Sequence, residues 1–286
     1  MFVVMGANGH VGSVVAKTLL ERGQAVTVVT HNESHGARWR GAGAQIALAD
    51  ANDRDSLRRA LSLGTRAFLL NPPADVARDT DAVELATVAG ILAALDGSSL
   101  EKVVAESTAG AKPGHRIGDA SALWELEEGL RARSIPSAIN RAPFCMSNWE
   151  TQLVHIRKTG KLSTMLPEQL KLPMAAPDDL GRIAADRLMS GLDDVGVRFI
   201  EGPARYSACD VAAAFAHALK RPVEVECTPR EAWHAGYRAL GFSEPAADAY
   251  TRMTEAALDD GFDMIVDPLR GEISLAAYVA QLTKRR

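Results

Sequence analysis

Three glycines near the start of the chain are spaced so that the loop between them can hold a phosphate group. Residues 6–12 read Gly-Ala-Asn-Gly-His-Val-Gly, directly after the apolar residues 2–5. In such a pattern Gly6 allows a tight turn, Gly9 lets the backbone approach a pyrophosphate, and Gly12 lets a helix pack closely on a strand. The same glycines would also fit a purely structural turn without a ligand. Phosphate binding is favoured because a strand is expected directly before the loop and a helix directly after it. The expected dinucleotide contacts in the loop are Gly6, Asn8, Gly9, His10, Val11 and Gly12.

The residues after the expected second strand indicate which dinucleotide the loop would take. NAD sites usually carry an acidic residue there, about 20 residues after the glycines, that binds the ribose 2′-hydroxyl. Thr30 stands in that place, and the polar residues that could surround a 2′-phosphate are His31, Asn32, Ser34 and Arg38. NADP(H) is therefore the expected cofactor. NAD(H) stays open because Glu33 could reach a ribose hydroxyl.

Composition limits the classes of protein to which the chain can belong. Its 286 residues carry a formal net charge of −4, and 47% of them are hydrophobic. These values are typical of a globular chain and exclude a disordered, collagen-like or coiled-coil one. A nucleic-acid partner would need clustered excess Lys and Arg, and the only basic cluster, residues 284–286, is expected to be a solvated tail end. We therefore expect no direct contact with nucleic acid.

Membranes and metals are not expected either. No apolar run reaches the ~18 residues that a membrane helix needs, and no Cys or His pair has the spacing of metal ligands. The three cysteines, Cys145, Cys209 and Cys227, are odd in number and widely spaced. Such usage indicates free thiols in a reducing compartment, so the expected location is the cytoplasm.

The first 140 residues contain short apolar runs that alternate with helical patterns. Strands are expected at residues 2–5, 25–29, 45–49, 67–70, 102–105 and 137–140, and helices at 11–22, 53–63, 80–95 and 123–133. This alternation predicts right-handed βαβ crossovers and a doubly wound parallel sheet of the Rossmann type, an α/β fold. Asp53 is expected to cap its helix. Asp50, at the end of the third strand, is expected at the adenine edge or, equally, as an acidic residue at that helix start.

The regular alternation of strands and helices ends at about residue 150. Helices are expected at residues 151–159, 178–190 and 209–219, with an irregular stretch at 161–174. A seventh strand is expected at 197–200, a short strand at 223–227, and two or three further helices beyond. We therefore divide the chain into a dinucleotide domain (residues 1–150, with 178–203 returning to it) and a smaller α-rich lobe (151–177 and 204–286) that shapes a substrate cleft.

Several stretches together resemble the NmrA-like branch of the atypical short-chain dehydrogenase/reductase superfamily. They are the glycine loop, Asp50 with Asp53–Leu57, Leu70-Asn71-Pro72-Pro73, Val103–Thr108, Glu127–Leu130 through Ile135-Pro136, Asn140–Asn148 with its Arg-x-Pro-Phe-x-x-x-Asn pattern, and residues 176–185. The resemblance covers nearly the whole chain. It implies a Rossmann domain with a small C-terminal domain and a cleft between them. Members include NAD(P)H-dependent quinone reductases, azoreductase-like proteins, and proteins that sense the dinucleotide without evident catalysis.

The resemblance also implies where further site residues lie. Dinucleotide contacts are expected from Ala51, Asn71, Pro72, Ala142, Pro143 and Phe144, with Phe144 against the nicotinamide. Ser107 and Thr108 stand where the superfamily's catalytic serine lies, and either hydroxyl could bind a substrate oxygen. Trp124 could stack on a flat acceptor. The remaining substrate contacts are expected from His115, Arg141, Asn148 and Trp149. For each of these side chains plain packing, capping or solvent exposure is the alternative.

The proton relay of most short-chain dehydrogenases is missing. They use Tyr-x-x-x-Lys, in which the tyrosine transfers a proton, and none of the four tyrosines is followed by lysine at that spacing. Many NmrA-like proteins keep a lysine three residues before the glutamate that aligns with Glu127, and here that residue is Trp124. Two hypotheses remain. The chain is an NAD(P)H-dependent reductase of a quinone or similar planar electrophile, or a non-catalytic NADP(H) sensor that binds a regulatory protein partner; a homodimer is left open.

Overall fold

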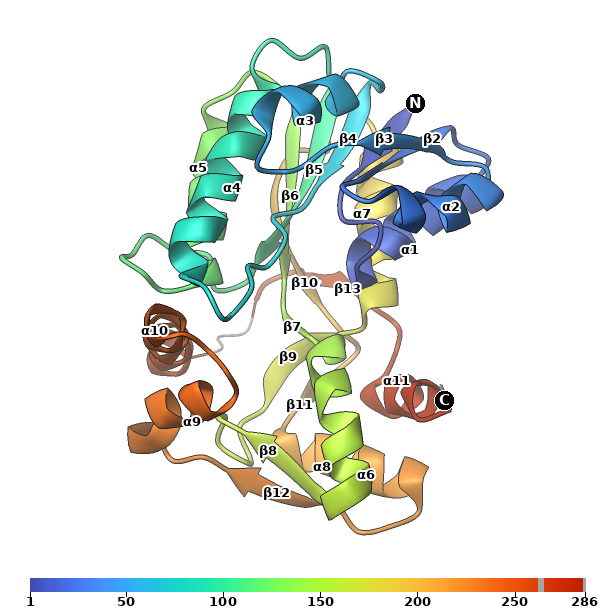
Figure 1. The fold of residues 1–286 in the computed structure, drawn as a ribbon. Coiled ribbons are helices and arrows are strands. Elements are labelled where there is room, and N and C mark those ends of the chain that lie inside the picture. The colour runs from blue at the N-terminus through green and yellow to red at the C-terminus, as the bar shows by residue number, and fades with distance from the viewer. Residues whose placement is uncertain (262–264, 285–286) are drawn as a thin grey trace.

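A parallel sheet of eight strands lies at the centre of the fold (Figure 1). The computed structural model describes residues 1–261 and 265–284, so Arg285 and Arg286 of the basic tail lie outside the described residues. The strands are β1 (Phe2–Val4), β2 (Val26–Thr30), β3 (Gln45–Leu48), β4 (Arg66–Leu69), β5 (Lys102–Thr108), β6 (Ser137–Ala142), β10 (Gly196–Glu201) and β13 (Leu269–Arg270). Their order is β13-β10-β6-β5-β4-β1-β2-β3, and every pair is parallel. The expected doubly wound, Rossmann-type sheet is confirmed.

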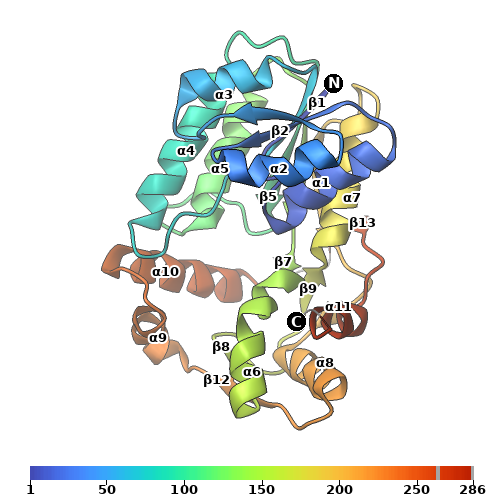
Figure 2. The ribbon, with the colours of Figure 1, turned by 45° about the vertical axis from the view of Figure 1, so that its right-hand side comes forward.

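Helices cover both faces of this sheet (Figures 1 and 2). One face carries α3 (Arg54–Leu61), α4 (Thr80–Leu95) and α5 (Asp119–Arg131), and the other carries α1 (His10–Glu21), α2 (Glu33–Gly41) and α7 (Pro177–Met189). Strand β5 shows why both faces must be covered: Val103 and Ala105 pack into the core on the α5 side, and Val104 packs into the core on the α1 and α7 side. Asp53 caps α3, as expected, because its carboxylate accepts from the backbone N–H groups of Asp55 and Ser56.

The two central strands are longer than expected. Strand β5 was expected to end at residue 105 and β6 at residue 140, but they continue to Thr108 and Ala142. Their register pairs Glu106 with Asn140 and Ser107 with Arg141. Because side chains alternate between the faces of a sheet, the first pair faces α7 and the second pair faces α5.

The smaller lobe contains two small sheets as well as helices, and it takes in residues 144–150, which we expected in the dinucleotide domain. Its helical elements are the 3₁₀ helix η1 (Met146–Gln152), α6 (Leu153–Thr159), α8 (Ala208–Leu219), η2 (Arg230–Ala232), α9 (Trp233–Ala239), α10 (Glu244–Asp260) and α11 (Leu275–Leu282). Strands β7 (Phe144–Cys145), β9 (Leu172–Ala175) and β11 (Arg205–Tyr206) form one sheet, and β8 (Lys161–Thr164) pairs with β12 (Glu224–Cys227). The expectation of an irregular stretch at 161–174 was wrong for β8 and for most of β9, because the prolines at 167 and 173 suggested a loop. Pro173 lies inside β9, whose neighbour β11 pairs with it for only two residues.

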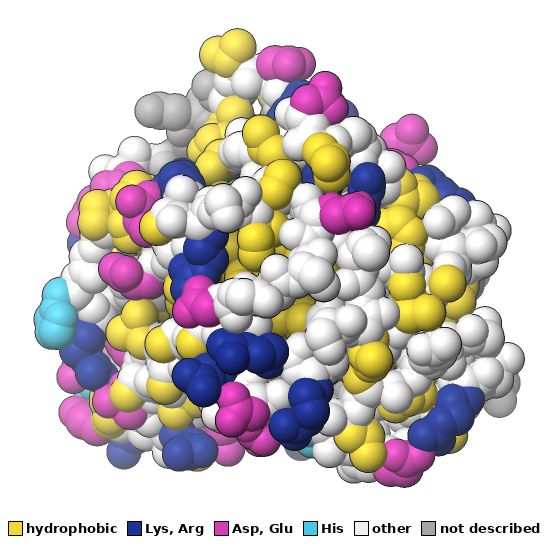
Figure 3. All heavy atoms as spheres, turned by 90° about the horizontal axis from the view of Figure 1, so that it is seen from above, with side chains coloured by type: hydrophobic (Ala, Val, Ile, Leu, Met, Phe, Trp, Pro, Cys, Tyr) yellow, Lys and Arg dark blue, Asp and Glu magenta, His cyan; other side chains and the backbone are white. Residues whose placement is uncertain are grey.

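Two further features complete the fold. Strand β13 comes from the last part of the chain, beyond most of the smaller lobe, and it pairs with β10 at the edge of the large sheet. The strands of the large sheet begin at the end of the molecule opposite the smaller lobe. Exposed hydrophobic side chains in the segments that precede these strands include Met1, Leu63, Leu192 and Val195. Figure 3 shows hydrophobic side chains near the middle of this face. None of the helices within residues 1–261 and 265–284 has the length and hydropathy that crossing a bilayer requires.

Candidate active site

The glycine loop connects β1 to α1 in the geometry that its spacing predicts. Gly6 has a φ of 67°, which favours glycine, and its carbonyl accepts from the N–H of Gly9 at 2.9 Å. A Cβ on Gly12 would lie 2.4 Å from the carbonyl oxygen of Gly6, whereas one on Gly9 would meet nothing closer than 3.4 Å. Gly12 is therefore required by backbone packing. Gly9 is not, so the space beside it is available to a ligand.

The loop is tied to the end of β2, where the expected ribose site lies. The Asn8 amide donates to the Thr30 hydroxyl at 3.1 Å, and Arg38 donates to the Ala7 carbonyl at 2.9 Å. Asn32 caps α2, because its side-chain oxygen accepts from the Ser34 N–H at 2.9 Å. The structure thus brings these residues together at one edge. Helix α2, which positions Arg38, was missed in the sequence because its buried residues are only Gly36 and Trp39.

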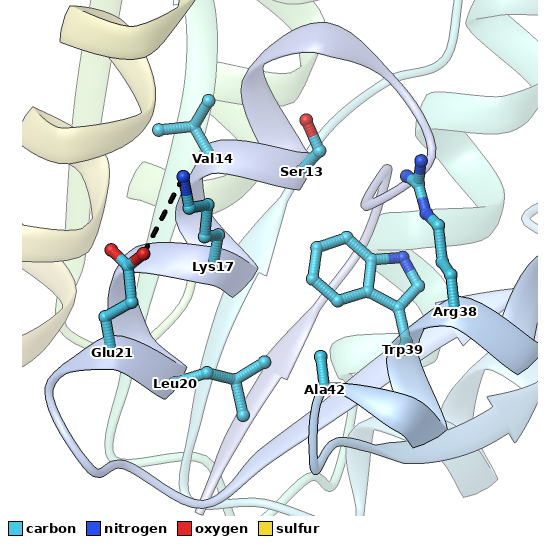
Figure 4. A pocket seen from close by; sticks show the side chains of 8 residues that line it. All are labelled: Ser13, Val14, Lys17, Leu20, Glu21, Arg38, Trp39 and Ala42. Atoms are coloured by element: carbon cyan, nitrogen blue, oxygen red, sulfur yellow. Dashed lines mark ion pairs between the residues drawn. The ribbon is translucent and has the colours of Figure 1, made fainter.

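A hollow of about 620 Å³ opens between α1 and α2 beside this edge (Figure 4). Its lining residues are Ser13, Val14, Lys17, Leu20, Glu21, Arg38, Trp39 and Ala42. Arg38 lies at its border, and the Arg38 guanidinium also lies 5.0 Å from the centre of the Trp39 ring. The exposed His31 contacts the His35 ring edge to face, with the ring centres 6.1 Å apart.

Asp50 and Asn71 lie at the carboxyl ends of two other strands. Asp50 is exposed and accepts from the Asn52 N–H at 2.9 Å, so it shapes the turn before α3. The neighbouring Ala51 packs against the core. Asn71 follows β4, on the far side of the point between β1 and β4 where the strand order reverses, which is where ligands bind in such sheets. Its side-chain oxygen is buried and has no hydrogen-bond partner within the described residues, while Pro72 beside it is exposed.

Ser107 and Arg141 are both bound to one buried carboxylate. Glu127, on α5, is fully buried and accepts from the Ser107 hydroxyl at 2.6 Å and from two Arg141 nitrogens at 2.8 Å each. Arg131 adds a further bond at 2.8 Å. The Trp124 ring lies 5.5 Å from the Arg131 guanidinium and 5.9 Å from that of Arg141. On the α5 face of the sheet, these side chains thus provide hydrogen-bond and charge partners for one another. Of the three glutamates on this helix, Glu125 and Glu128 are exposed and only Glu127 is buried.

On the other face of β5 a second buried carboxyl has far fewer partners. The Asn140 amide donates to one Glu106 oxygen at 3.4 Å, and the other oxygen has no partner within the described residues. Burial raises the pKa of Glu106 to about 8. Arg187 donates to the Asn140 side chain at 2.9 Å. Burial also raises the pKa of the nearby Cys145 thiol, which disfavours a nucleophilic thiolate there.

The remaining residues expected near the nicotinamide and the substrate are spread over both lobes. Thr108 is half-buried at the end of β5, and the Ala142 carbonyl beside it accepts from the Ala109 N–H at 2.8 Å. Phe144 follows the buried Pro143 and lies 5.3 Å from Trp149, ring centre to ring centre, and Trp149 is buried in the core of the smaller lobe.

Two further expected substrate contacts are exposed. Asn148 lies on η1. His115 lines a second hollow between α4 and α5, together with Asp81, Arg116 and Glu125. It is therefore not brought next to the glycine loop residues.

A group of carboxyls at the start of α4 was not found in the sequence. Burial, with the nearby carboxyl of Asp119, raises the pKa of Glu84. Asp81 is also buried, and burial raises its pKa as well. The Glu84 carboxyl accepts from the Ala74 N–H at 3.0 Å, so it fixes the loop that follows Asn71. An acidic residue in a helix gives by itself no signal that distinguishes these buried positions from solvated ones.

The sheet order, the glycine loop and the ligand-facing edge define a Rossmann-type protein of the dinucleotide-binding kind. The chain belongs to the NmrA-like family, whose model matches residues 1–264.

Three known proteins show how far the likeness extends. The chain is 22% identical over 267 residues to an NAD(P)H azoreductase from Xenophilus azovorans, which covers 93% of this chain and 91% of the relative. It is similar to an NADPH-dependent quinone oxidoreductase from Escherichia coli in complex with NADPH (TM-score 0.81, 17% identity) and to a triphenylmethane reductase from Citrobacter sp. (TM-score 0.80, 16% identity). Both of these similarities cover 99% of each chain.

Proposed function

We propose that the protein is an NADP(H)-dependent reductase of a quinone or similar planar electrophile. The observation that carries this proposal is the open edge formed by the glycine loop, Arg38 and the unpartnered Asn71 oxygen. The named relatives, which are reductases of azo compounds, quinones and triphenylmethane dyes, support it. NAD(H) stays open as a weaker cofactor.

The residues present fit a dinucleotide. Backbone N–H groups at the start of α1 would hold the pyrophosphate, Arg38 would meet a 2′-phosphate, and the buried Asn71 oxygen would accept from a ribose hydroxyl or an amide. Such a cofactor supplies a hydride when bound. Arg38 is tied to the glycine loop, so its charge is already in place before the ligand arrives.

Of the hydroxyls expected near the acceptor, we propose Thr108 as the group that binds its oxygen. The Ser107 hydroxyl is used by Glu127, and two guanidinium groups lie close to the Trp124 ring. Burying the two reacting rings together orients them and excludes water, which contributes to the rate without a Tyr–Lys pair.

Cofactor choice tests the proposal directly. A ligand that binds the native state raises the melting temperature by mass action, so NADPH should give a larger shift than NADH. Arg38→Ala removes a hydrogen bond to a charged group, worth about 1.5–3 kcal/mol, and should reduce the preference for NADPH by about 10- to 150-fold. Arg40→Ala is the matched control, since Arg40 pairs with Glu33 on the same helix. Equal shifts with both dinucleotides in the unmodified protein would contradict the NADP(H) assignment.

Turnover separates the reductase from the alternative of a dinucleotide sensor, which the missing Tyr–Lys pair favours. We expect NADPH oxidation above background with at least one member of a panel of quinones and dyes. Tight binding of NADPH with no turnover on any acceptor would favour the sensor instead.

A further inference from the structure

The His10 side chain lies where the glycine loop meets the smaller lobe. His10 is the first residue of α1, and its side chain is 56% exposed. Its Nδ1 lies 4.0 Å from a carboxylate oxygen of Glu150, which belongs to η1 of the smaller lobe. The contact therefore joins two segments that are 140 positions apart in the chain and that belong to different parts of the fold.

The surroundings of His10 are unusual for a histidine at the start of a helix. The N-terminal end of a helix carries partial positive charge, which disfavours a cation there. Glu150 supplies the opposite charge from the other lobe. The Tyr278 hydroxyl, on α11, donates to the same Glu150 oxygen and holds it in place. The smaller lobe thus provides a held counter-charge for a cationic imidazole beside the phosphate loop.

One imidazole nitrogen remains for another partner. Nδ1 faces Glu150, so Nε2 lies on a different side of the ring. Within residues 1–261 and 265–284 the imidazole makes no hydrogen bond. A dinucleotide held by the loop would lie next to this side chain. Phe144, which we expect against the nicotinamide, contacts Trp149, the residue before Glu150, and this contact relates His10 to the nicotinamide end.

We propose that His10 donates the proton that completes reduction of an acceptor oxygen, and that Glu150 and Tyr278 position it. The inference rests on the proposed reductase function and names the proton source that the missing Tyr–Lys pair leaves open. A quinone that accepts a hydride from the reduced dinucleotide becomes a hydroquinone monoanion. The His10 imidazolium then releases its Nε2 proton to the anionic oxygen, giving the hydroquinone. The dinucleotide ends oxidised, and the neutral imidazole takes a new proton from solvent.

Two acceptors with different proton requirements test this step. A quinone needs a proton after the hydride, whereas a triarylmethyl dye cation becomes a neutral product by accepting the hydride alone. His10→Gln keeps a polar side chain but cannot act as a general acid. Since general acids contribute typically 10²–10⁴-fold, we expect the ratio of quinone turnover to dye turnover to fall about 100-fold in this variant. The ratio cancels any change in dinucleotide binding. His35→Gln, an exposed histidine on α2, is the matched control.

Chemical rescue adds a readout that a structural role would not change. Imidazole in solution should restore quinone turnover to His10→Ala in a concentration-dependent way. Glu150→Gln and Tyr278→Phe should lower the ratio by smaller factors, because they only loosen the position of the imidazole.

Calorimetry of NADPH binding gives a readout that needs no turnover. Phosphate charges beside the loop should draw a proton onto the unmodified protein when NADPH binds. This uptake appears as a dependence of the binding enthalpy on the ionisation enthalpy of the buffer. His10→Gln should lose that dependence while still binding NADPH.

An unchanged ratio in His10→Gln, or equal losses with both acceptors, would overturn the inference and leave the reductase function standing. Absence of turnover by the unmodified protein with either acceptor would overturn both. Proton uptake that persists in His10→Gln would also contradict the assignment.

Discussion

Strand β5 carries a carboxyl arrangement on each of its faces, and the two arrangements differ sharply. On the α5 face Glu127 accepts four hydrogen bonds from Ser107, Arg131 and Arg141. On the α7 face Glu106 has one long bond, from Asn140, and an oxygen without a partner in the described chain. The first carboxylate is buried as part of an ion pair, whereas burial keeps the second protonated at neutral pH. Burial alone therefore does not decide the charge of a carboxyl; the donors around it do.

The largest expected effect comes from removing the satisfied carboxylate. Glu127→Ala leaves the Arg141 guanidinium in the interior without a counter-charge, and breaking a buried pair in this way costs about 3–5 kcal/mol. We expect that loss in the free energy of unfolding, measured by chemical denaturation. Glu125→Ala, on an exposed position of the same helix, should stay within about 0.5 kcal/mol of the unmodified protein. Similar losses of unfolding free energy in both variants would mean that the hydrogen bonds and ion pairs of Glu127 do not stabilise the fold.

Removing the unsatisfied carboxyl should have the opposite sign and depend on pH. The folded pKa of Glu106 is raised from 4.5 to about 8. As pH rises from 4.5 to 8 the unfolded chain loses this proton while the folded chain keeps it, so stability falls across that window. Glu106→Gln removes the titration. Its stability relative to the unmodified protein should therefore increase by a few kcal/mol between pH 5 and pH 8. A difference that does not vary with pH would show that Glu106 titrates normally.

The smallest effect separates the two neighbouring hydroxyls. Ser107→Ala removes one bond to the Glu127 carboxylate and should cost about 1.5 kcal/mol of stability. Thr108→Val should cost less stability and should lower reductase turnover, since we place this hydroxyl at the acceptor. Denaturation and steady-state NADPH oxidation on both variants check the assignment. Loss of turnover in Ser107→Ala at unchanged stability would reverse the two roles.

The sequence predicted the sheet and the glycine loop because both depend on local patterns. The loop follows from glycine spacing, and the strands follow from short β-branched runs. It did not predict where β5 ends, because Glu106 and Ser107 look like residues that terminate a buried strand. Their partners, Asn140 and Glu127, are 34 and 20 positions away. Only the assembled sheet shows that these polar groups can be buried.

The positions of site residues, too, are predictable from the sequence only where they depend on local patterns. Gly12 and Arg38 both lie at the glycine loop, because Gly12 packs against Gly6 and Arg38 donates to the Ala7 carbonyl. Arg141 was expected to face the substrate, yet the longer β6 directs its side chain toward α5. Periodicity does not show whether Arg141 lies inside the strand or in the loop after it, and alternation fixes the face of a side chain only inside the strand.

The short strand β13 has a consequence for how the chain is made. Ile200 and Glu201 of β10 lie at the border of the sheet until Leu269 and Arg270 pair with them. During synthesis, close to 70 residues must leave the ribosome before that border is covered. Until then the nascent chain presents open backbone N–H and C=O groups to any other strand, which exposes it to aggregation during this interval.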